Sequence, residues 1–169
     1  MELPYADNTF DAATMALVLF FVPAPGQGVA EMKRVVKPGG SVSAYAWDML
    51  GGGFPFEPVF KELRARGHTP ADPPSVDASR RDAMQALWRN AGLTDVETRV
   101  ISVERSFDDF EDFWMSIVPA PGMKAALAKM TPVEAAEMKE RVRGNLPAAA
   151  DGSITYPAWA NAVKGRVAG

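Results

Sequence analysis

Apolar residues in this chain occur either as short continuous runs or as stripes at helical spacing. Residues 10–22 form a dense apolar run without clean alternation, which predicts a strand buried on both faces, as in a parallel sheet. Residues 25–36 carry apolar side chains at helical spacing, and the Pro-Gly-Gly turn at 38–40 is expected to end that helix. Residues 41–47 alternate and predict a second buried strand. Strand, helix and strand in this order indicate the repeating unit of a parallel α/β sheet.

The second half of the chain continues with further helices and two more strands. The glycine triplet at 51–53 indicates a flexible connection, and residues 56–66 favour a short helix. Residues 96–103 predict a strand whose charges suit a sheet edge. A last strand is expected within 153–167, after a helical insert at about 106–150.

Helix starts are indicated where a serine or threonine precedes an acidic residue by three positions. The three pairs are Ser79 with Asp82, Ser106 with Asp109, and Thr131 with Glu134. We therefore expect one helix to begin after Ser79 and two helices of the insert to begin after Ser106 and Thr131.

Composition narrows the function classes. The chain has 169 residues, of which 47% are hydrophobic and 23% charged, as in an ordinary globular domain. Its net charge of −3 and its lack of a basic cluster exclude a nucleic-acid partner, and its apolar runs are too short for a membrane partner. There is no cysteine and a single histidine, His68, so no thiolate chemistry and no metal site are expected. No basic leader precedes an apolar stretch, and we expect a cytoplasmic location.

Two motifs resemble those of a known family. Residues 3–11 read L-P-Y-A-D-N-T-F-D, similar to the L-P-F-x-D-x-S-F-D signature of class I S-adenosylmethionine (SAM)-dependent methyltransferases of the small-molecule type. Residues 31–40 read E-M-K-R-V-V-K-P-G-G, which resembles the family's E-x-x-R-V-L-K-P-G-G. Both lie at the family's spacing. The resemblance implies a partial Rossmann-like α/β sheet, strands four to seven of the family fold, with helices on its faces and an antiparallel last strand.

The family's cofactor fingerprint does not occur in this sequence. The resemblance implies a glycine-rich turn for the SAM carboxypropyl group and an acidic residue for its ribose, and neither is present. The triplet at 51–53 follows the wrong strand and lacks G-x-G-x-x-G spacing. We therefore expect a truncated C-terminal half of the domain, with Met1 an internal methionine or the edge of a shortened gene. SAM is the implied cofactor, and this chain alone is expected not to bind it.

The resemblance also assigns candidate residues near the cofactor. Met15, Ala16 and Leu17 lie where the family's fourth strand ends beside the SAM methyl and amino groups; the alternative is plain strand core. Phe20 and Phe21 replace a His-His pair of many relatives and are candidates for the substrate pocket. The alternative for this pair is a hydrophobic plug or an oligomer contact.

Further candidates for the substrate pocket lie later in the chain. Trp47 and Asp48 end the family's fifth strand, where Asp48 is a candidate to orient a substrate or act as a base. Capping of the following loop is its alternative role. Phe110 and Trp114 are candidates for a cavity wall, whereas an aromatic stripe at helical spacing more often packs in a core. No catalytic residue is assigned.

Two functions from different classes remain open. One is SAM-dependent methyl transfer to a small organic substrate, which the resemblance implies. The other is a non-catalytic remnant of the fold that forms a homodimer through the exposed edge of the strand at about 10–19. A nicotinamide-binding half-domain is a weaker third reading, because it needs the same missing fingerprint.

Overall fold

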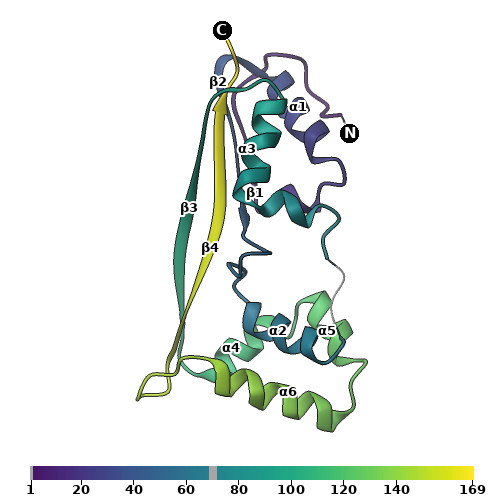
Figure 1. Ribbon diagram of the computed structural model, residues 1–169, viewed down its shortest axis with the longest axis vertical. Coiled ribbons are helices and arrows are strands. Elements are labelled where there is room, and N and C mark those ends of the chain that lie inside the picture. Colours follow the sequence, from purple (N-terminus) through teal and green to yellow (C-terminus); the bar gives the residue numbers. More distant parts are fainter. Residues whose placement is uncertain (1, 69–71) are drawn as a thin grey trace. The chain divides into compact units, whose positions relative to one another are not determined.

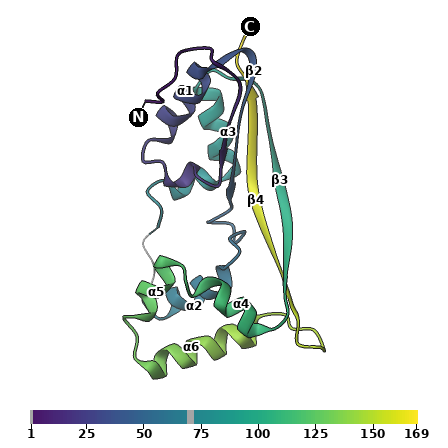
Figure 2. The ribbon, with the colours of Figure 1, turned by 180° about the vertical axis from the view of Figure 1, so that it is seen from behind.

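A computed structural model describes residues 2–68 and 72–169, and the chain divides into two compact units. The first unit comprises the chain up to Phe54, residues 72–102 and residues 159–169. The second comprises residues 55–68 and 103–158. Strands β3 (Thr94–Phe107) and β4 (Ile154–Arg166) contribute residues to both units. Figure 1 shows the order of elements along the chain, and Figure 2 shows them from behind.

The first unit is built on a mixed sheet in the order β1-β2-β4-β3. Strand β1 (Phe10–Ala16) pairs in parallel with β2 (Val36–Trp47), with Ala16 opposite Tyr45. Strand β4 pairs antiparallel with β2, with Trp47 opposite Ala160. The expected α/β class and the antiparallel last strand are therefore confirmed.

Two helices cover one face of β1 and β2 in the first unit, α1 (Pro25–Val35) and α3 (Arg81–Asn90) (Figures 1 and 2). They pack against alternate residues of β2, which are buried: Val42, Ala44 and Ala46. The indole nitrogen of Trp88 on α3 donates to the carbonyl of Val42 at 2.9 Å, which ties the helix to the sheet. This half of the sheet has its apolar core on the side of α1 and α3.

The prediction that residues 10–22 form a strand buried on both faces is wrong. Strand β1 ends at Ala16, and a 3₁₀ helix, η1 (Leu19–Phe21), follows it. Ala12, Thr14 and Ala16 are exposed, and the Thr14 hydroxyl bonds that of Ser43 at 2.8 Å. The physical reason is that the helices of the first unit cover one face of β1, where Ala13 and Met15 pack on the core, so the alternate residues face solvent.

The sequence predicted that the Pro-Gly-Gly turn at 38–40 ends the helix, and this prediction is wrong. Helix α1 ends at Val35, and β2 begins at the next residue, so the turn residues lie within the strand. Gly40 is required there for close packing, because a Cβ atom at this position would lie 2.7 Å from the carbonyl oxygen of Asp11 on β1.

Only one of the three expected capping boxes forms. Thr131 and Glu134 form a reciprocal capping box at the start of α6 (Pro132–Asn145). Helix α4 (Phe110–Ile117) is capped by Asp109, whose side chain accepts from the amide of Asp112 at 2.9 Å. Ser106 lies on β3 instead, and its hydroxyl forms a hydrogen bond with that of Thr155 on β4.

The start of α3 also differs from the expected Ser79–Asp82 box. Its N-cap residue is Arg80, whose side chain does not cap the helix. Ser79 is fully buried at the end of η2 (Val76–Ser79), and its hydroxyl has no partner among the described residues. Asp82 pairs with Arg80 at 2.9 Å, and the carboxylate is thereby drawn away from a capping position.

The second unit is mainly helical and has its own core. Helices α2 (Glu57–Ala65), α4, α5 (Pro121–Leu127) and α6 contribute to it, and α2 contacts α6. Its largest buried side chains include Leu63, Phe113 and Met123. The insert predicted between the last two strands therefore belongs to this unit.

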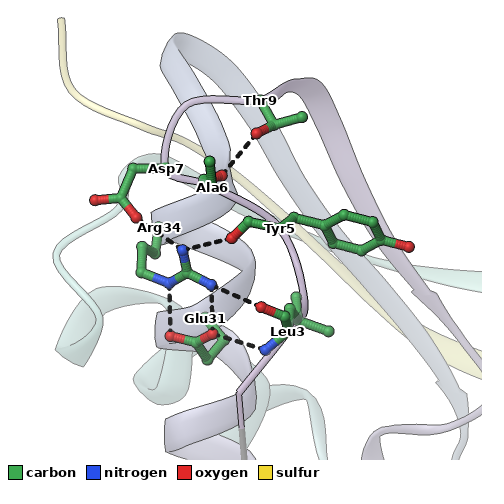
Figure 3. Close-up of polar contacts among 7 residues, drawn as sticks. All are labelled: Leu3, Tyr5, Ala6, Asp7, Thr9, Glu31 and Arg34. Atoms are coloured by element: carbon green, nitrogen blue, oxygen red, sulfur yellow. Dashed lines mark hydrogen bonds and ion pairs between the residues drawn. The ribbon is translucent and has the colours of Figure 1, made fainter.

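A polar clamp, made of Leu3, Tyr5, Asp7, Glu31 and Arg34, fixes the segment before β1 against α1 (Figure 3). The Arg34 guanidinium donates to both Glu31 oxygens, to Asp7 and to the carbonyls of Leu3 and Tyr5. The hydrogen bonds from Arg34 to the Glu31 carboxylate, with one from the Leu3 amide, lower the pKa of Glu31 to about 2. The two motif segments therefore meet in a structural clamp that sets where β1 begins.

Candidate functional site

The carboxyl ends of β1 and β2 meet at one edge of the sheet, because the two strands are parallel. Ligands of open α/β sheets bind outside this edge. Met15 is half-buried and packs on the first unit's core, whereas Ala16 is exposed. Leu17 has φ +56°, and its amide donates to the carbonyl of Tyr45 at 2.8 Å. A bulky residue in the left-handed region is uncommon and marks this strand end as strained.

The pair Phe20-Phe21 is split between core and surface. Phe20 is buried in the core of the first unit, while Phe21 is 59% exposed. The two ring centroids lie 4.5 Å apart. The surface of η1 near this edge is therefore aromatic.

The end of β2 carries Trp47 and Asp48. Trp47 is half-buried against the first core. The Asp48 carboxylate accepts from the amide of Gly51 at 2.9 Å and from the indole nitrogen of Trp159 at 3.3 Å. Asp48 thus holds the loop 48–53 closed, which is the capping role that the sequence left open.

A pocket of about 550 Å³ lies beside this loop, and all its lining residues belong to the first unit. It combines apolar and charged side chains: Asp48, Leu50, Gly51, Arg80, Arg81, Asp82, Val100 and Asn161. We call it the α3 pocket, since three of these residues begin α3. The Arg80 side chain lowers the pKa of Asp82 by hydrogen bonding, aided by the Ala83 amide. Arg80 is held in this ion pair, whereas Arg81 forms no ion pair with any described side chain.

Asn161 is a buried polar residue in the wall of the α3 pocket. It is only 4% exposed, and its amide nitrogen donates to the carbonyl of Ser79 at 2.9 Å. Sequence reasoning missed Arg80, Arg81 and Asn161. Little in the sequence indicates these three residues, because the two arginines stand at the start of a helix and the asparagine lies in a run of alanines and valines.

A second hollow, of about 380 Å³, lies over the middle of β2, β4 and β3 in the first unit. Ser43, Tyr45, Arg99 and Lys164 are among its lining residues. It shares no lining residue with the α3 pocket, so the two hollows are separate.

Phe110 and Trp114 belong to the second unit, where both are buried in its core. Their rings stack with centroids 5.9 Å apart, and Lys139 and Arg143 lie over the Phe110 ring. Glu111 holds both cations at 2.6 and 2.7 Å. The core-packing interpretation of this aromatic stripe accounts for these contacts.

Two other classes of site receive no support from the described residues. Within 2–68 and 72–169, no group of three or more His, Cys, Asp or Glu side chains is placed to hold a metal ion. No helix in the same part of the chain combines the length and the apolar character that crossing a membrane requires.

The candidate cofactor residues suit one side of SAM only. Exposed Ala16 and the strained backbone at Leu17 offer a small apolar surface at the carboxyl edge. A carboxylate for a ribose and a glycine-rich turn before a helix are both lacking in the printed sequence. The residues present therefore fit the methyl-donor end of such a cofactor better than its nucleoside end.

Comparisons with known proteins find methyltransferases, the family that the two motifs resemble. Residues 1–44 match a family model described as a methyltransferase domain. A demethylmenaquinone methyltransferase of Halalkalibacterium halodurans is 33% identical over 120 residues, 60% of this chain and 47% of that protein. A demethylmenaquinone methyltransferase of Bacillus mycoides is 60% identical over 42 residues, 25% of this chain and 18% of that protein. The chain thus spans less than half the length of either curated relative.

Solved structures share the fold. A protein of Bacillus halodurans C-125, provisionally described as a methyltransferase, superposes with a TM-score of 0.55 at 15% identity. The YcgJ protein of Bacillus subtilis superposes with a TM-score of 0.53 at 16% identity. Each superposition covers 99% of this chain and 68% of the other.

Proposed function

We propose that this chain, which has the N-terminal sequence and the Rossmann-like fold of the class I SAM-dependent methyltransferases, takes part in methyl transfer to a small organic acceptor. The observation that carries the proposal is the family match over residues 1–44, which contains β1 and ends within β2. These are the strands whose carboxyl ends lead to Leu17 and Asp48. The demethylmenaquinone methyltransferases among the relatives support a ring compound as the acceptor.

The residues of this chain are suited to positioning. When bound, SAM supplies a methyl group from its sulfonium, and the acceptor atom attacks in line. Ala16 and Leu17 offer the surface for the donor end, and the α3 pocket offers the acceptor a place at the same sheet edge. Such a reaction needs few dedicated catalytic groups, so the sparse chemistry at this edge is compatible with it.

The test is a titration of S-adenosylhomocysteine into the purified chain, followed by the thermal midpoint. At a hundredfold excess over Kd, a ligand that binds the native state contributes about 2.7 kcal/mol. For a chain of this size, the midpoint should rise by roughly 5–10 °C, and such a rise would overturn the expectation from the missing fingerprint that this chain alone does not bind SAM. No rise at saturating concentrations would overturn the proposal for this chain.

A matched pair of variants locates the site. Ala12 and Ala16 lie on β1, are both exposed, and share a face because they are an even number of residues apart. Ala16→Phe should abolish the rise in midpoint by occupying the candidate surface, whereas Ala12→Phe should preserve it. Equal responses of the two variants would place the cofactor elsewhere.

A second candidate function, a non-catalytic homodimer, is favoured by the position of β1. This strand is the edge of the described sheet, with one partner strand, and no proline interrupts it. We propose that residues 10–19 of two copies pair about a two-fold axis. Sedimentation velocity at low micromolar concentration should show a dimer that Ala12→Lys converts to a monomer. A monomeric wild-type chain would rule this candidate out.

A further inference from the structure

We propose that two copies of this chain join their sheets through β1 in a single register, with Thr14 of each copy beside the two-fold axis. The inference rests on the second function proposed above, the homodimer, and it specifies which residues face each other across the interface. The register follows from the main chain of β1 and from the side chains on its exposed face.

The main chain of β1 determines which residues can bond to a second copy. The Leu17 amide donates to the Tyr45 carbonyl on β2 at 2.8 Å. Main-chain N–H and C=O groups of successive strand residues point to opposite sides of the strand. Those of Ala12, Thr14 and Ala16 therefore point away from β2, to the side of β1 that has no neighbouring strand in the described sheet.

A two-fold axis between the copies makes the two edge strands antiparallel and restricts their register. Residues that exchange main-chain hydrogen bonds in such a pair lie directly opposite each other, so even-numbered residues must face even-numbered residues. The pairing of β1 with β2 is irregular between Phe10 and Ala12, and the regular edge is 12–16. Only with Thr14 on the axis do all three outward residues find partners within this stretch. Thr14 then faces Thr14 of the second copy, and Ala12 faces Ala16.

The side chains on the exposed face of β1 favour the same register. Ala12, Thr14 and Ala16 are exposed, and the Thr14 hydroxyl bonds that of Ser43 on β2 at 2.8 Å. With Thr14 on the axis, the two threonine hydroxyls lie on adjacent strands and extend this bond into a row of four hydroxyls across the interface. In a register centred on residue 13, Thr14 would face Ala12 and gain no hydroxyl partner.

The chemistry of this edge suits a second copy as its occupant. No charged residue occurs between Ala12 and Ala30, so the pairing opposes no like charges, and no proline interrupts β1. An edge of this kind accepts an added strand through its main-chain donors and acceptors. A two-fold pairing satisfies these groups on both copies at once.

Cross-linking tests the register directly, because the chain has no cysteine of its own. Each variant carries one introduced cysteine and is oxidised with diamide, and dimers are measured on a non-reducing gel. Residues opposite each other in a hydrogen-bonded pair have Cα atoms about 5.5 Å apart, within the range of about 4.4–6.8 Å that a disulfide requires. We therefore expect Thr14→Cys to cross-link on its own.

The matched variants are Ala12→Cys and Ala16→Cys. Each should stay uncross-linked alone, because equivalent residues lie four positions apart along the strands, more than about 13 Å. The two should cross-link when they are mixed and allowed to exchange subunits. Cross-linking of Ala12→Cys with Thr14→Cys instead would place residue 13 on the axis and overturn the inference. Equal cross-linking of all variants, or of none, would also overturn it.

A second measurement needs no introduced cysteine. Thr14→Val keeps a β-branched side chain and removes the hydroxyl, so it should raise the Kd of the dimer about two- to tenfold in sedimentation equilibrium. Ser41→Ala removes a hydroxyl from β2, one strand away from the interface, and should leave this Kd unchanged. An unchanged Kd in Thr14→Val, or the same rise in both variants, contradicts the hydroxyl row.

Sedimentation of the wild-type chain separates this inference from the homodimer on which it rests. A wild-type dimer whose cysteine variants cross-link in another register refutes the inference and leaves the homodimer standing. A monomeric wild-type chain refutes the homodimer itself, and the register with it.

Discussion

Replacement of Gly53 by alanine tests whether the loop that closes the α3 pocket is as tightly seated as the contacts indicate. The main chain of Gly53 bonds Asp48 through its amide at 2.8 Å and the Trp159 amide through its carbonyl at 3.0 Å. A Cβ atom at this position would lie 2.3 Å from the carbonyl oxygen of Trp159 and 2.8 Å from its indole. The glycine is therefore needed for close approach, and the triplet is not the flexible connection that the sequence suggested.

The cost of this substitution follows from the contacts that must break. Two main-chain hydrogen bonds contribute about 0.5–1.5 kcal/mol each, and overpacking against Trp159 adds about 1–3 kcal/mol. We expect Gly53→Ala to reduce the free energy of unfolding by about 2–6 kcal/mol. Gly52 is the matched control, because it has φ +85° and a Cβ there would lie 3.9 Å from the Trp159 ring. Asparagine tolerates that conformation, so Gly52→Asn should cost about 1 kcal/mol or less.

Urea denaturation of the wild type and both variants measures these differences. A free energy within about 0.5 kcal/mol of the wild type, inside the usual range for neutral sites, would refute the close approach.

Three further predictions concern the framework of the two units. The pKa of Glu31 is lowered from about 4.5 to about 2 by Arg34 and the Leu3 amide, so the clamp stabilises the fold above pH 4.5 and loses its contribution as pH falls toward 2. The stabilities of Glu31→Gln and the wild type, measured by acid unfolding, should therefore approach each other between pH 4.5 and about 2, and a constant difference would contradict the clamp. Trp88→Phe should cost about 1–3 kcal/mol in urea denaturation, because it leaves the buried Val42 carbonyl without its indole donor; an unchanged midpoint would show that this bond contributes nothing. Thr131→Ala should cost about 1 kcal/mol by removing the capping box of α6, and a loss restored by Thr131→Ser would identify the hydroxyl as its source.

Local sequence patterns predicted most of the elements correctly. Helical periodicity identified α1 and α3, and the Thr131–Glu134 pair identified the start of α6, because these features depend on neighbours within one turn. The same reasoning failed for Ser79 and Ser106, whose hydroxyls resemble caps in sequence. One is buried without a partner and the other bonds across to Thr155 on β4.

Alone, the sequence determined the α/β class, the strand–helix–strand unit and the resemblance of its first 47 residues to a methyltransferase, since these are encoded in short motifs and periodicities. Tertiary structure alone decided that β1 is an edge strand open on one face and that Asp48 is a loop cap. It also decided that residues near positions 48, 81 and 161 line one pocket. That pocket exists because β4 inserts beside β2 in the sheet and carries Asn161 toward the start of α3. Pairing between strands more than a hundred residues apart depends on the packing of the whole unit, which no local pattern encodes.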